Sequence, residues 1–159
     1  MLAKLGRNTS FLGKVGDDMF GRLLREVIES VGIDSRGLVS SSECNTTLAF
    51  VQQLPGGDRD FSFYRKPGAD QMLREDELCL EQITGSRIFH FGSLSMTHEP
   101  ARQATKRALK AAREAGVLIS FDPNLRPPLW DSLEGKGLSD FLDSPFMIFR
   151  GLLFCFFYF

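Results

Sequence analysis

Residues 87–122, RIFHFGSLSMTHEPARQATKRALKAAREAGVLISFD, contain the pattern that decides the fold. An apolar run at Arg87–Gly92 is followed by a helical stretch from about Pro100 to Ala115 and by a second apolar run at Val117–Asp122. Proline near the first turn and Gly116 just past the last are typical of helix boundaries. A strand, a helix and a strand over this length predict a βαβ unit with parallel strands and a right-handed crossover.

A second strand and helix are predicted nearer the N-terminus. Ser10–Val15 is a short apolar run, and Gly16-Asp17-Asp18 turns the chain into a helix that either aspartate can cap. Apolar residues then recur at helical spacing until Gly32, namely Phe20, Leu23, Leu24, Val27, Ile28 and Val31. A Gly-rich turn at a helix start can hold a phosphate. Its spacing matches neither a P-loop nor a dinucleotide fingerprint, so we favour a structural turn.

A β-hairpin is predicted at about residues 46–65. Thr46–Leu54 and Arg59–Arg65 are β-type runs, and the residues between them, Pro-Gly-Gly-Asp, are a strong turn signal. Phe63 and Arg65, with Asp70 close behind, suit a polyol, because rings pack on a sugar's carbon face and charged groups bind its hydroxyls. The alternative is a half-buried hairpin with a solvated arginine.

The loop after residue 122 is a second candidate site. Ligands bind beyond the carboxyl ends of parallel strands, and Asn124 and Arg126 follow such an end. An arginine held in place by neighbouring prolines suits phosphate or another anion. The alternative is a Pro-rich loop with a capping aspartate. Two further expectations are a short helix at Glu75–Ile83 and a buried core position for His90, which lies inside an apolar strand.

Composition excludes several classes of function. The net charge is −1 and there is no basic block, which argues against a nucleic-acid partner. The three cysteines are scattered without a CxxC pair, so we expect free thiols, a cytoplasmic location and no metal site. The Phe-rich residues 136–159 contain no uncharged run long enough to span a membrane, which takes about 17–25 apolar residues.

Several of these segments, in this order, resemble the PfkB (ribokinase-like) carbohydrate kinases. Gly6 and Gly16, separated by nine residues, resemble the end of the family's first signature, and residues 11–21 (FLGKVGDDMFG) its next strand, turn and helix. Residues 46–51 (TTLAFV) and 63–65 (FYR) resemble its lid hairpin. Residues 68–70 (GAD), 90–93 (HFGS) and 122–130 (DPNLRPPLW) are typical of its fructokinase branch. The resemblance covers residues 1–135, with residues 136–159 as a non-family hydrophobic tail.

The resemblance implies an α/β fold with a parallel, Rossmann-like sheet, flanking helices and a small β-hairpin lid. It implies transfer of the ATP γ-phosphoryl group to a sugar hydroxyl, with Mg²⁺ as the complete enzyme's metal. Phe63, Arg65 and Asp70 would bind the sugar, and Asn124 and Arg126 would lie near the phosphoryl group. A homodimer through the lid is also consistent with the family.

The sequence also departs from the family pattern. The Gly-Ala-Gly-Asp motif, whose aspartate is the family's general base, does not occur in the 159 residues, so no catalytic residue is assigned. Loss of a general base typically costs about 10²–10⁴-fold in rate. We therefore expect a chain truncated at both ends and inactive alone. Three alternatives stay open: a kinase for 2-keto-3-deoxygluconate or a riboside, a non-catalytic sugar-binding or regulatory protein, and a gene-model artefact.

Overall fold

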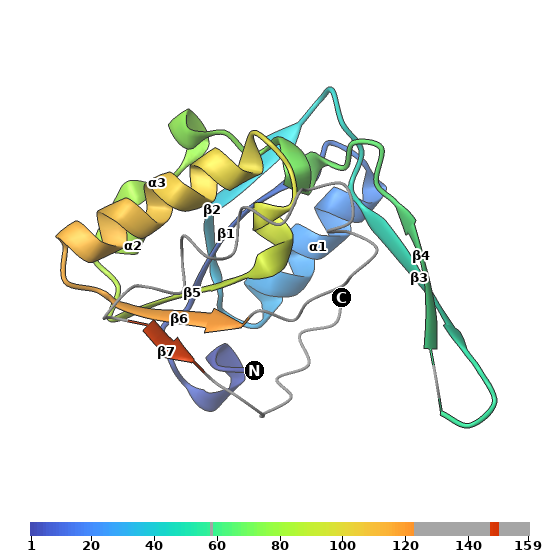
Figure 1. Ribbon diagram of the computed structural model, residues 1–159, viewed down its shortest axis with the longest axis horizontal. Helices are drawn as coiled ribbons and strands as arrows, with labels where there is room; N and C mark the ends of the chain where they lie inside the picture. Colours follow the sequence, from blue (N-terminus) through green and yellow to red (C-terminus); the bar gives the residue numbers. More distant parts are fainter. Residues whose placement is uncertain (58, 123–146, 150–159) are drawn as a thin grey trace.

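The structure is a computed structural model that describes residues 1–57, 59–122 and 147–149. These residues form two parallel sheets, β1–β2 and β5–β6–β7, and an antiparallel hairpin, β3–β4. Figure 1 shows helices α1 and α3 packed with the two sheets and the hairpin projecting away from them. No helix in the described ranges is long and apolar enough to cross a membrane.

The first layer combines β1 (Ser10–Gly16), α1 (Met19–Ser30) and β2 (Asp34–Ser41) after a short 3-10 turn, η1 (Ala3–Leu5). The predicted strand and helix are confirmed. Strand β2 was not predicted, because the sequence DSRGLVSS has little apolar character of its own and becomes a strand by pairing in parallel with β1. Val15, Ile28 and Leu38, one from each element, form the core between the helix and this sheet.

The second layer is the βαβ unit predicted at residues 87–122. It consists of β5 (Ile88–Gly92), α3 (Ala101–Glu114) and β6 (Leu118–Asp122), and its two strands pair in parallel, with Phe91 opposite Phe121. Alanines and Leu109 of α3 pack on the inward residues of the strands, which include Phe91, Ile119 and Phe121. A third parallel strand, β7 (Met147–Phe149), pairs with β6 and lies within the Phe-rich segment, where the sequence analysis predicts no strand.

Two expectations were wrong. The segment Glu75–Ile83 is two short helices, η3 (Glu75–Glu77) and α2 (Leu80–Thr84), because Leu78 takes an extended backbone and packs with Leu80 against the α3 core. His90 is exposed instead of buried. Side chains alternate across a strand, so Phe89 and Phe91 face α3 while His90 lies on the other face, where its Nδ1 is 3.0 Å from Ser120 Oγ.

The predicted hairpin is confirmed as β3 (Leu48–Gln53) and β4 (Arg59–Tyr64). Phe61 and Phe63 share one face and stack with ring centroids 6.1 Å apart. The opposite face is aromatic as well, since Phe50 and Tyr64 meet edge to face at 5.5 Å. Two further 3-10 turns, η2 (Ala69–Met72) after the hairpin and η4 (Ser93–Met96) after β5, bring polar side chains to its base.

Candidate functional site

An arginine–aspartate pair lies at the base of the hairpin, where β4 returns to the body of the fold. Arg65 donates to Asp70 Oδ2 from both Nε, at 3.0 Å, and Nη2, at 2.5 Å. A guanidinium that uses two donors on one carboxylate holds it with defined geometry. The structure therefore brings together two of the three residues that we predicted to bind a sugar.

Two threonines complete this network and connect four segments of the chain. The Thr47 hydroxyl donates to Asp70 Oδ1 from the start of the hairpin, and Arg65 Nη1 lies 3.5 Å from Thr97 Oγ1, just past η4. Thr97 is 1% exposed, and its hydroxyl donates to the Leu94 carbonyl at 2.8 Å. The network therefore joins both ends of the hairpin to the body through η2 and the segment that follows β5.

Asp70 is the accessible member of the pair. The Arg65 side chain is 8% exposed, whereas that of Asp70 is 41% exposed. Arg65 can therefore orient the carboxylate and balance its charge, while the open side of Asp70 can accept hydrogen bonds from a ligand's hydroxyls. Phe63 lies two positions before Arg65 and is 36% exposed, so an aromatic face is available on the strand that leads into the pair.

Gly68 allows the turn that places Asp70. A Cβ at this position would overlap Thr47 Oγ1 and come within 2.7 Å of Asp70 Oδ1. The Gly68 amide donates to Gln71 Oε1 at 3.0 Å, and Gln71 is 3% exposed. The sequence Gly68-Ala69-Asp70 thus acts as a tightly packed unit, and a larger residue at 68 would displace the carboxylate.

The Gly-rich turn before α1 is structural, as we favoured. Asp18 caps the helix by accepting from the Gly21 amide at 2.8 Å, so a carboxylate of the chain itself takes the place a phosphate would use. Burial raises the pKa of Asp18, but hydrogen bonds from Thr46 and from the amides of Gly21 and Phe20 outweigh it and hold this pKa below its usual value of 3.8.

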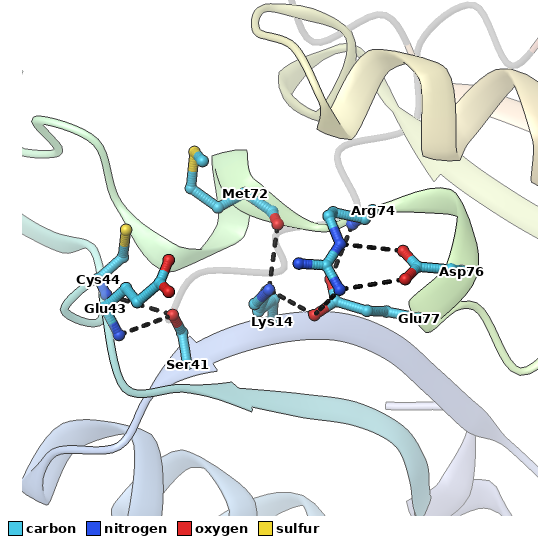
Figure 2. Close-up of polar contacts among 8 residues, drawn as sticks. All are labelled: Lys14, Ser41, Glu43, Cys44, Met72, Arg74, Asp76 and Glu77. Carbon is cyan, nitrogen blue, oxygen red and sulfur yellow. Dashed lines mark hydrogen bonds and ion pairs between the residues drawn. The ribbon is translucent and has the colours of Figure 1, made fainter.

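A buried ion pair anchors the segment that follows Asp70 (Figure 2). Lys14 of β1 donates to Glu77 Oε1 at 2.6 Å and to the Met72 carbonyl at 3.2 Å, and the Lys14 side chain is 7% exposed. Burial raises the pKa of Glu77, whereas hydrogen bonds from Lys14 and the Arg74 amide lower it more strongly, so this pKa lies below its usual value of 4.5. Lys14 therefore pins η2 and η3 to the sheet on either side of Leu73.

The other predicted site residues, Asn124 and Arg126, lie outside the described residues. Within the described ranges, no three His, Cys, Asp or Glu side chains gather in a way that could hold a metal ion. We therefore assign Mg²⁺ no role in the geometry above.

Comparison with known proteins places this chain in a family. Residues 1–150 match the family described as pfkB family carbohydrate kinase. The chain belongs to that family. It is 47% identical over 133 residues to probable fructokinase-3 of Arabidopsis thaliana and to fructokinase-1 of Zea mays, with 84% of this chain covered in each case. The aligned region is 39% of the Arabidopsis protein and 41% of the maize protein.

Solved PfkB-type structures have the same ribokinase-like α/β fold. A fructokinase from Xylella fastidiosa, also solved with bound ATP, superposes with a TM-score of 0.77 at 38% identity. The match covers 84% of this chain and 41% of the Xylella chain. The chain thus spans about two-fifths of the length of these relatives.

Arg65 and Asp70 were predicted from the sequence, but the residues that support them were not. No local sequence pattern distinguishes Thr47 and Thr97 from other threonines, because their hydrogen-bond partners are brought close only by the tertiary fold. Lys14 left a usable signal, because a lysine inside an otherwise apolar strand needs a buried partner. That partner, Glu77, is 63 positions away in the chain, and no local pattern connects the two residues.

Proposed function

We propose that this chain forms the hairpin-bearing, sugar-facing part of an ATP-dependent sugar kinase, and that the sugar is fructose. The observation that carries the proposal is the Arg65–Asp70 pair at the base of an aromatic hairpin, in a chain 47% identical to proteins named fructokinases. A carboxylate with an open side, oriented by an arginine that follows an aromatic strand, suits a polyol.

In this mechanism the chain binds and shields the sugar. Asp70 accepts hydrogen bonds from sugar hydroxyls, Arg65 orients Asp70, and Phe63 packs on the carbon face of the ring. The hairpin excludes water from the acceptor hydroxyl, which limits hydrolysis of the phosphoryl donor. ATP supplies the γ-phosphoryl group and Mg²⁺ is its counterion, with Asn124 and Arg126 assigned to the phosphoryl side. No general base is assigned to this chain, and we propose that the 159 residues alone do not turn over sugar.

A chimera tests this function. The aligned 133 residues of maize fructokinase-1 are replaced by those of this chain, and phosphorylation of fructose, 2-keto-3-deoxygluconate and ribosides is followed by coupled ADP release. We expect fructose to be the preferred substrate, and Asp70→Ala to raise KM for fructose by at least about tenfold, as expected for loss of hydrogen bonds to a charged group. Asp76→Ala, which removes an exposed carboxylate six residues away, is the matched control.

Two outcomes would overturn the proposal. Preference of the chimera for another sugar would reassign the substrate, and equal KM values for the Asp70 and Asp76 variants would remove Asp70 from the site. Calorimetric titration of the 159-residue chain with fructose in the absence of ATP separates the non-catalytic alternative. A sugar-binding or regulatory protein binds fructose under these conditions. The kinase proposal expects little binding, because this chain spans only about two-fifths of the length of its relatives.

Three further assignments belong to the same proposal. The exposed apolar residues of the hairpin, on both of its faces, support a homodimer through the hairpin, which sedimentation velocity would detect. Cys44 and Cys79 are free thiols, which supports a reducing, cytoplasmic location. We place the boundary between family sequence and tail at residue 135, although the family match continues to residue 150.

A further inference from the structure

The hairpin enters the body of the fold at Thr46, and this residue is bound by a carboxylate from another element. Asp18, at the start of α1, accepts from the Thr46 amide at 2.7 Å through Oδ2 and from the Thr46 hydroxyl at 2.8 Å through Oδ1. The Thr46 hydroxyl oxygen in turn accepts from the Gly16 amide at 2.9 Å. Thr46 is 7% exposed, so these bonds are largely shielded from water.

These contacts exceed what a helix cap requires. Capping uses one side-chain oxygen on an amide of the first turn, and the bond from Asp18 Oδ1 to the Gly21 amide supplies it. The second oxygen, Oδ2, is used for Thr46. The approach is also close: a Cβ on Gly16 would lie 2.6 Å from the Thr46 amide nitrogen and 2.8 Å from the Cys44 carbonyl oxygen. The start of the hairpin is therefore held against the turn between β1 and α1.

Beyond this point the hairpin has little other support. Positions 49–57 are all exposed, and its returning end is held by the Arg65–Asp70 pair. The orientation of the whole hairpin is therefore set at its base, by Asp18 on Thr46 and by Asp70 on both Thr47 and Arg65. Figure 1 shows the hairpin extending away from the body beyond this base.

We propose that Asp18 is a positioning residue that acts through Thr46. The contact between these two residues is the pivot that fixes the orientation of the hairpin. The hydrogen bonds of the pivot do not depend on what the protein binds. Their consequence for sugar binding rests on the proposed function. With the pivot intact, Phe63 and Arg65 are presented in one orientation relative to Asp70. Without it, the hairpin samples many orientations and the sugar is covered for a smaller fraction of the time.

Nuclear magnetic resonance of the 159-residue chain tests the pivot. In Asp18→Ser, serine still caps α1 but does not reach Thr46; in Thr46→Val, the shape is kept and the hydroxyl is lost. We expect order parameters from residual dipolar couplings to fall in the hairpin from about 0.85 to below about 0.6 in both variants, with β1 and α1 unchanged.

Two conservative variants are the matched controls. Asp17→Asn removes the neighbouring carboxylate, which is exposed and pairs with Arg22 at 3.3 Å, and Thr46→Ser restores the hydroxyl. Both should keep wild-type order in the hairpin. If Asp18→Ser does not fold, Thr46→Val decides, because it leaves the helix cap intact. Wild-type hairpin order in Thr46→Val, or equal loosening in Asp17→Asn, would overturn the proposal.

The chimera with maize fructokinase-1 supplies a functional readout. Asp18→Ser should raise KM for fructose by about tenfold, consistent with loss of hydrogen bonds to a charged group, and leave KM for ATP unchanged. A rise in both constants would indicate general damage and count against a positioning role. A chimera without fructose activity would overturn the proposed function, while the result for the pivot would stand.

Discussion

Phenylalanine side chains show how differently the body of the fold and the β3–β4 hairpin are held. In the body, Phe91 and Phe121 are 7% and 2% exposed, and their ring centroids lie 4.8 Å apart beneath α3. In the hairpin, Phe50 and Phe63 are 56% and 36% exposed, and each ring packs with an aromatic neighbour of the hairpin. Similar residues thus stabilise one region by burial and leave the other open to a partner or ligand.

This difference in burial means that one kind of interaction stabilises the body and another sets the orientation of the hairpin. Apolar burial is strong and non-directional, so it holds the sheets and helices together. Hydrogen bonds and ion pairs are directional, and at the base of the hairpin they are made with Asp18 and Asp70. The hairpin can therefore be reoriented without unpacking the core, which suits an element that covers and releases a ligand.

The largest expected effect on the free energy of unfolding comes from replacing a phenylalanine by alanine in the body, compared with the same substitution in the hairpin. Phe121→Ala should lower the free energy of unfolding by about 3–5 kcal/mol, the usual cost of deleting a buried aromatic ring. Phe50→Ala should cost at most about 1 kcal/mol, the value of its edge-to-face contact with Tyr64. Urea unfolding followed by circular dichroism measures both, and similar losses would show that the hairpin is part of the core.

The second largest loss of stability is expected from removal of the buried Lys14 charge. Lys14→Met leaves the partly buried Glu77 carboxylate without its lysine. It should cost about 2–3 kcal/mol, below the cost for a fully buried pair, because Glu77 keeps some exposure and the bond from the Arg74 amide. Lys110→Met, which removes an exposed pair with Glu114, should change stability by less than about 0.5 kcal/mol. Equal effects of the two variants in urea unfolding would contradict the role assigned to Lys14.

A smaller and local effect is expected at the base of the hairpin. Arg65→Lys keeps the charge but loses the two-donor geometry on Asp70, and it should lower the opening free energy of the hairpin by about 1 kcal/mol. Native-state hydrogen exchange should register this loss in β3 and β4 and leave β5 and β6 unchanged. Arg74→Lys, on the exposed Asp76, is the control and should change neither region.

The smallest expected effect is a pH dependence in the body. The pKa values of Asp18 and Glu77 lie below their usual values of 3.8 and 4.5 in the folded chain. Their contribution to stability is therefore complete above those usual values, and it is lost as the pH falls through the lower folded-state values. Urea unfolding between neutral pH and pH about 3 measures it, and Glu77→Gln should flatten the part of the curve due to Glu77.

Local patterns predicted most of the fold. The βαβ unit at residues 87–122, the capped helix after Gly16 and the hairpin each carry their own periodicity and boundary residues, and all three are present. The elements without such a signal were missed or misjudged: β2 forms because β1 offers it an edge, and the helix expected at Glu75–Ile83 is interrupted where Leu78 packs on α3.

The candidate site divides in the same way. Sequence alone selected Phe63, Arg65 and Asp70, because aromatic and charged residues next to a turn indicate polyol chemistry, and it selected the family. Only the tertiary structure decided that Asp70 is the accessible member of its ion pair, that Lys14 meets Glu77, and that Asp18 binds Thr46. Periodicity reports which way a side chain faces along its own element. Which polar group it meets there depends on how distant segments pack, and that is settled by the whole fold.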